Sequence, residues 1–157
     1  MNVIDVLTHG HRDIERLLAR MRPSDWQATA LGTWSTKDLV GHLGAFEVRF
    51  ADVLASFVGE PLETDLTRAD PATFNDDQAA VRRDWSIDAI LGELRHANAR
   101  VMALAPRIGR DVWSTVGTIP WYGAEYALDD LVVYSMYGHK REHGPQLEAV
   151  LERPDRA

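Results

Sequence analysis

Histidine is the residue type in this 157-residue chain best suited to bind a metal ion, and the chain has six of them. It has no cysteine, so disulfides, thiolate metal sites and cysteine nucleophiles are excluded. His139 and His143 are four residues apart, which on a helix places both imidazoles on one face, separated by about 6 Å along the axis. His42 shares the apolar face of an earlier helical segment with Leu39 and Phe46. The three histidines therefore predict convergent ligands from two helices.

The spacing of His139 and His143 is a weak signal by itself, because six histidines in 157 residues give roughly 0.2 such pairs by chance. The alternative is that these histidines are packed in the core or solvated. Three neutral imidazoles on one side of an ion would leave coordination positions open, as in catalytic sites. This ligand set suits zinc, nickel, iron or copper, and the sequence does not distinguish among them.

Further polar and aromatic residues are candidates for a substrate pocket. His11 lies on the apolar face of the first helical segment, and Trp121 and Tyr122 lie in a glycine-flanked loop before the segment with the histidine pair. We expect these three residues to line a pocket. His9 and His96 fall off the apolar faces and are expected to be solvated.

Two carboxylates adjacent to the predicted ligands could orient an imidazole from behind. Asp38 has a simpler explanation, because Ser35 and Asp38 form a capping box at a helix start. Glu142 is equally well explained as part of a solvated helix face. The chain has no Gly-x-Ser-x-Gly elbow, phosphate-binding glycine loop or dinucleotide fingerprint, so serine hydrolase, kinase and Rossmann dehydrogenase functions are unsupported.

The elements that must position these residues are helices, since apolar residues recur every three or four positions and no strand alternation is sustained. The predicted helical segments are residues 2–21, 35–57, 72–85 continuing after a break as 86–104, and 124–151. The sequence thus predicts an all-α, single-domain four-helix bundle spanning residues 1–157. The long loops 58–75 and 106–124 permit either crossovers or hairpins.

The composition limits the possible partners. Lys and Arg number 17 against 24 Asp and Glu, a net charge of −7, which argues against nucleic acid and against acidic lipid surfaces. No apolar stretch approaches the ~20 residues of a spanning helix, and no signal peptide is apparent, so we expect a cytoplasmic protein without a membrane partner. A small-molecule substrate is the expected partner. A homodimer is the expected oligomer, because exposed bundle faces often pair symmetrically.

Three segments resemble a known family. The run from Trp34 to Leu43 (WSTKDLVGHL) resembles the second-helix motif of the DinB-like, or YfiT-like, metalloenzyme superfamily. The run from Tyr137 to His143 (YGHKREH) resembles its His-x-x-x-His helix, and Phe74-Asn75 resembles the Phe-Asn before its third helix. The resemblance spans essentially the whole chain. The Tyr-Gly-His and Glu-His pieces are most similar to the ClbS/DfsB-type four-helix-bundle branch.

The resemblance implies one divalent ion held by His42, His139 and His143. Related members include mycothiol-dependent maleylpyruvate isomerases and bacillithiol-dependent transferases, in which the metal activates a low-molecular-weight thiol. The ClbS branch protects its host by hydrolysing or binding a reactive metabolite. The expected function is therefore a metal-dependent enzyme acting on a small electrophilic metabolite, through activated water (a hydrolase) or a diffusible thiol cosubstrate (a transferase or isomerase). The alternatives are a non-catalytic binding or resistance protein of ClbS type, and a structural module with packed histidines.

Overall fold

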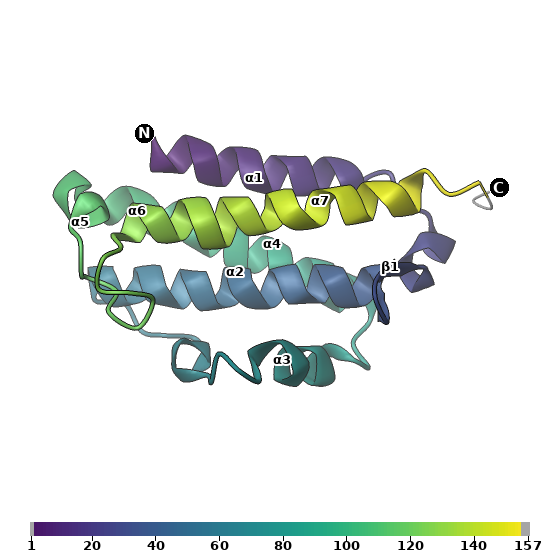
Figure 1. Ribbon diagram of the computed structural model, residues 1–157, viewed down its shortest axis with the longest axis horizontal. Helices are drawn as coiled ribbons and strands as arrows, with labels where there is room; N and C mark the ends of the chain where they lie inside the picture. The colour runs from purple at the N-terminus through teal and green to yellow at the C-terminus, as the bar shows by residue number, and fades with distance from the viewer. Residues whose placement is uncertain (1, 155–157) are drawn as a thin grey trace.

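The computed structural model describes residues 2–154, and these residues are predominantly helical (Figure 1). The α-helices are α1 (Val3–Leu18), α2 (Thr36–Val58), α3 (Phe74–Arg82), α4 (Ile87–Leu104), α5 (Arg110–Ser114), α6 (Leu128–Leu131) and α7 (Gly138–Leu151). Short 3-10 turns are η1 (Pro23–Gln27), η2 (Leu66–Arg68) and η3 (Ala105–Arg107), and η4 (Val132–Tyr137) is a π-helical segment. Strands β1 (Thr29–Leu31) and β2 (Trp34–Ser35) form a small antiparallel hairpin. Within this part of the chain, no helix is both long and apolar enough to cross a membrane.

The four long helices α1, α2, α4 and α7 form a bundle with one parallel pair in each layer (Figure 1). α2 and α4 run in the same direction, because Gly44 lies beside Glu93 and, further along both helices, Glu47 contacts Asn98. α1 and α7 are also parallel, since contacts advance along both helices together, from Gly10 opposite Tyr137 and Lys140 to Leu17 opposite Gly144. The all-α bundle predicted from the sequence is confirmed. Its long loops are crossovers, and α3 lies on the connection between α2 and α4 (Figure 1).

Capping residues set the start of α2, the helix that carries His42. Ser35 and Asp38 form the predicted capping box, in which the Ser35 side chain accepts from the Asp38 amide and Asp38 accepts from the Ser35 amide at 2.9 Å. Gly59 ends the helix with a φ of 73°, a left-handed conformation that favours glycine. Asp38 therefore has a capping role, and its carboxylate accepts hydrogen bonds from Ser35.

The segment after residue 105 differs from the sequence prediction. The predicted helix 124–151 begins only at Leu128 and passes through the π-helical segment η4 before α7. The predicted loop 106–124 contains the short helix α5. α7 continues through Pro145, which lacks one backbone N–H but does not end the helix.

A layer of polar side chains divides the apolar core into two clusters. One cluster lies toward the start of α1, and includes Leu7 and Phe50, while the other lies toward its end, and includes Ile14 and Leu43. Between them lie Glu47 from α2, Lys140 from α7 and Asn98 from α4, all buried. Lys140 Nζ donates to Glu47 Oε2 at 2.6 Å, and Asn98 Nδ2 donates to Glu47 Oε1 at 3.0 Å. This polar layer ties three helices together at mid-height.

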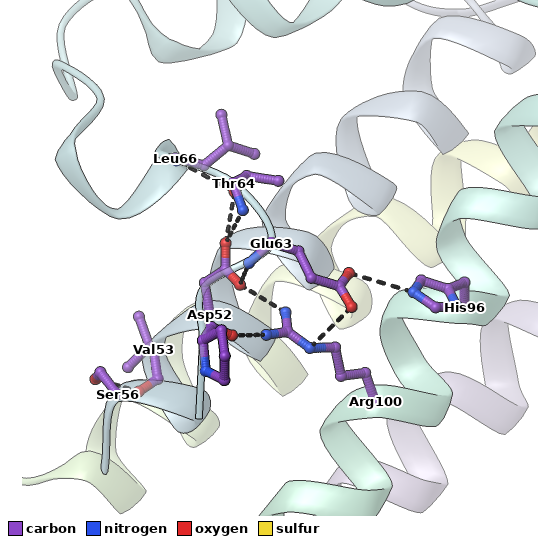
Figure 2. Close-up of polar contacts among 9 residues, drawn as sticks. Asp52, Val53, Ser56, Glu63, Thr64, Leu66, His96 and Arg100 are labelled. Carbon is purple, nitrogen blue, oxygen red and sulfur yellow. Dashed lines mark hydrogen bonds and ion pairs between the residues drawn. The ribbon is translucent and has the colours of Figure 1, made fainter. Parts of the chain in front are cut away.

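A second buried carboxylate, Asp52, anchors the loop that follows α2 (Figure 2). It accepts hydrogen bonds from the backbone amides of Glu63 and Thr64, both at 2.9 Å, and is paired with Arg100 of α4. Figure 2 shows Arg100 reaching across to Asp52 and Glu63 together. Burial raises the pKa of Asp52, but the bonds from Thr64, Arg100 and the Glu63 and Thr64 amides outweigh burial and lower it overall. These contacts hold the start of the connection between α2 and α4 against both helices.

Candidate metal centre

Three histidine side chains meet between α2 and α7. His42 Nε2 lies 2.8 Å from His139 Nε2, and His143 Nε2 lies 2.9 Å from the same atom. One potential ligand atom of each residue lies within 4.8 Å of the other two. His139 and His143 are one helical turn apart on α7, and antiparallel packing brings His42 of α2 to the same height. The structure thus brings together the three residues that the sequence predicted to converge.

The environment of the three histidines keeps two of them neutral at neutral pH. Burial, together with the neighbouring His143, lowers the pKa of His42 to about 4. Burial lowers the pKa of His139 to about 3, with further contributions from His42, His143 and Lys140. A neutral imidazole is the form that coordinates a metal ion, so the protein holds these side chains ready for coordination.

Gln146, one turn beyond His143, fixes the tautomer of that histidine. His143 Nδ1 lies 2.7 Å from Gln146 Oε1. Because an amide oxygen can only accept, Nδ1 donates to it, and in the neutral imidazole Nε2 is then the nitrogen whose lone pair faces the other two histidines. The sequence analysis missed Gln146, although its position three residues after His143 on the same helix was a usable signal. Glu142, the carboxylate considered for this role, is exposed.

The donor set fits a divalent ion of the nitrogen-binding class. Three imidazole nitrogens, two of them held neutral and one fixed in its tautomer, match the ligands of three-histidine catalytic sites. His42 Nδ1 is buried without a hydrogen-bond partner in residues 2–154, so its ring is oriented by packing. Trp34 and Phe46 supply that packing, each with its ring centroid 4.9 Å from that of His42.

A mostly apolar cavity of about 210 Å³ adjoins the histidines. Phe46 is shared between the two, because it lines the cavity and its ring centroid lies 4.4 Å from that of His139. Trp121 and Tyr122, both predicted to line a pocket, do line this cavity. His11 does not: it lies half-buried on α1, with Nε2 3.7 Å from Glu15 Oε1. His9 and His96 are exposed, as expected.

The π-helical segment η4 presents residues to the cavity and lies just before the histidines of α7. Ser135 and Met136 line the cavity, and His139 follows one residue after Gly138. Wide turns of this kind are rare and are frequently found at functional sites. A Cβ on Gly138 would lie 2.9 Å from the Val133 carbonyl oxygen, closer than side chains approach. Glycine at this position therefore permits the wide turn immediately before the first histidine of α7.

The sequence analysis also missed Arg49, the one charged residue among those that line the cavity within the described chain. Its position offered a signal, since Arg49 lies three residues after Phe46 and four before Val53, on the same apolar face of α2. A lone cation on such a face requires an explanation.

The fold and the three histidines define a helical-bundle protein with a candidate metal centre between its second and last long helices. The family model of the DinB superfamily matches residues 7–147, and the chain belongs to that superfamily. No significant match was found among curated proteins or among solved structures.

Proposed function

We propose that this protein binds one divalent metal ion through His42, His139 and His143 and acts on a small electrophilic metabolite. The observation that carries the proposal is the convergence of three imidazole nitrogens from two helices. Membership of the DinB superfamily supports it. When bound, a divalent ion with open coordination positions supplies Lewis acidity that makes water or a thiol nucleophilic at neutral pH.

The protein's own residues supply the setting for this chemistry. Burial keeps His42 and His139 unprotonated, and Gln146 holds the third histidine in the coordinating tautomer. Trp34 and Phe46 exclude water from one side of the histidines, and the adjoining cavity takes the substrate. Because the chain contains no cysteine, a thiol mechanism requires a diffusible cosubstrate.

Metal titration tests the first step. Metal-free protein is titrated calorimetrically with Zn²⁺, Ni²⁺ and Fe²⁺, and at least one of these ions is expected to bind with one-to-one stoichiometry. The variants H42A, H139A and H143A are each expected to weaken that binding at least tenfold, whereas H96A changes an exposed histidine and leaves it unaltered. If no ion binds, or if H42A binds as the wild type does, the proposed metal centre is wrong.

Turnover tests the second step. Metal-loaded and chelator-treated proteins are incubated with epoxides and α,β-unsaturated carbonyl compounds, with and without a low-molecular-weight thiol. Metal-dependent consumption of an electrophile is expected, and the requirement for thiol separates a transferase or isomerase from a hydrolase. Stoichiometric binding without turnover would instead support a protein that sequesters a reactive metabolite.

A further inference from the structure

Arg49 is a half-buried cation that contacts two aromatic rings at the wall of the cavity. Its guanidinium carbon lies 5.1 Å from the ring centroid of Phe74 and 5.3 Å from that of Trp121. These rings orient the planar guanidinium and offset part of its desolvation, but they accept none of its hydrogen bonds in the way a carboxylate does. Arg49 Nε is buried and has no hydrogen-bond partner in residues 2–154.

Three other cations in the described part of the bundle are paired with carboxylates. Arg82 makes two hydrogen bonds to Glu93, at 2.6 and 2.7 Å. Arg100 is paired with Asp52, and Lys140 with Glu47. For Arg49 the described chain provides no such anion, and burial lowers the pKa of its guanidinium accordingly. Arg49 is half-buried, its Nε–H is buried without an acceptor, and it lacks the carboxylate that these cations have, so the missing partner points to a ligand.

The cavity beside Arg49 has the size and lining for such a ligand. Its volume of about 210 Å³ leaves room for a small organic molecule. The walls include Phe50, Val53 and Met136, which favour an apolar body. Tyr122 adds a hydroxyl that accepts from Ser135 Oγ at 3.0 Å, which leaves the phenolic proton available for another acceptor.

We infer that this cavity binds a small carboxylate with an apolar body, whose anionic group is held by Arg49 and Tyr122. A carboxylate matches the paired N–H donors of a guanidinium, and the apolar walls of the cavity accommodate the rest of the molecule. Because Phe46 borders both this cavity and the histidines, a molecule held here would lie beside the candidate metal centre. A carboxylate with an apolar body is thus the substrate class for the proposed function. Its chemical conversion rests on that proposed function, whereas its binding at Arg49 does not.

Matched pairs of probes test this binding site. Calorimetry compares benzoate with benzyl alcohol, and butyrate with butanol, because the members of each pair differ chiefly in charge. The wild type is expected to bind the carboxylate at least tenfold more tightly than the alcohol. In R49Q, carboxylate binding is expected to weaken about tenfold or more, the effect of losing a charge-assisted hydrogen bond, while alcohol binding stays within twofold. R83Q removes an exposed arginine that does not line the cavity and is expected to change neither.

A second measurement covers the case in which R49Q does not fold. The Nε–H resonance of Arg49 in the wild type is followed by NMR during titration with benzoate, and a saturable shift is expected with benzoate but not with benzyl alcohol. Equal affinity for the charged and neutral members of both pairs, or unchanged benzoate binding in R49Q, would overturn the inference.

Measurements with and without metal separate this inference from the proposed function. Carboxylate binding that depends on Arg49 in metal-free protein supports the site even if the histidines bind no ion. Carboxylate binding that requires Zn²⁺ and is unchanged in R49Q would mean direct ligation of the ion. That result would refute the role of Arg49 and leave the metal proposal intact.

Discussion

At the scale of single residues, the protonation state of the histidines couples the candidate site to the stability of the protein. His42 and His139 are held neutral by burial, with pKa values of about 4 and about 3, whereas an unfolded histidine has a pKa near 6.5. Between these values the unfolded chain binds protons that the folded chain does not, so folding is opposed as the pH falls. The same groups that are ready for a metal ion therefore weaken the metal-free fold in acid.

We predict that the free energy of unfolding of metal-free protein is fully retained above pH 6.5 and declines as the pH falls toward 4 and then 3. The decline is expected to approach about 1.4 kcal/mol per pH unit for each of the two histidines. Urea unfolding between pH 6.5 and pH 5 measures this slope, in a range above the usual titration of carboxyl groups.

The double variant H42N/H139N provides the control for this slope. Any contribution of His11, whose pKa is also lowered by burial and by Lys140, remains in both proteins and cancels in the comparison. The double variant is expected to lose much of the pH dependence. An identical slope in the two proteins would show that neither histidine is responsible.

At the scale of elements, the π-helical segment η4 determines where α7 presents its histidines. The Gly138 amide donates to the Val133 carbonyl five residues earlier, and a side chain on Gly138 would collide with that carbonyl. A change in this wide turn would rotate every later residue of α7 about the helix axis, including His139 and His143. The geometry of the candidate site thus depends on a backbone feature that lies outside the site.

We predict that G138A destabilises the protein by about 1–3 kcal/mol and weakens metal binding at least tenfold, because the turn must shift to admit the methyl group. G92A is the matched control, since a Cβ on Gly92 of α4 meets no atom within 4 Å. That variant is expected to gain about 0.5–1 kcal/mol with metal affinity unchanged. Calorimetric titration together with urea unfolding measures both properties. Metal affinity in G138A equal to that of the wild type would contradict the positioning role of the turn.

The elements differ in how far the sequence could predict them. Local sequence signals indicated both ends of α2, the capping box at Ser35 and the glycine at 59. Each signal corresponds to a known backbone geometry. The hairpin β1–β2 was missed because strands of three and two residues are too short to show alternation. The π-helical segment was missed because apolar periodicity assumes 3.6 residues per turn throughout.

The residues of the candidate site divide in the same way. His139 and His143 share one helix, so their spacing indicated a common face. His42 was grouped with them because it lies on the apolar face of another helix, and the family resemblance implied the same three ligands. Gln146 and Arg49 depend on the packing of side chains and on the presence of an adjoining cavity. A single sequence shows that Arg49 lies on an apolar face, but it does not show that the cation lacks a partner there.

At the scale of the whole molecule, the polar layer lies next to the candidate metal centre along the bundle. Glu47 lies five residues after His42, and Lys140 directly follows His139, so the layer and the site share α2 and α7. The side chains of Glu47 and Lys140 are 0% and 5% exposed, so each charge depends on the other for its solvation. We infer that the layer fixes the register of the bundle helices that carry the histidines.

Removing one charge of this pair should cost far more than removing both. We predict that E47Q destabilises the protein by about 3–5 kcal/mol, because Lys140 is left buried without a counter-ion, and that K140M has a similar effect by isolating Glu47. The double variant E47Q/K140M is expected to be more stable than either single variant, since it buries no unpaired charge. Urea unfolding of the four proteins completes a double-mutant cycle.

D13N, which breaks an ion pair whose side chains are 54% and 65% exposed, serves as the control and should change stability by less than about 1 kcal/mol. If the costs of E47Q and K140M simply add in the double variant, the two charges do not stabilise one another, and some other contact must hold α2 and α7 in register.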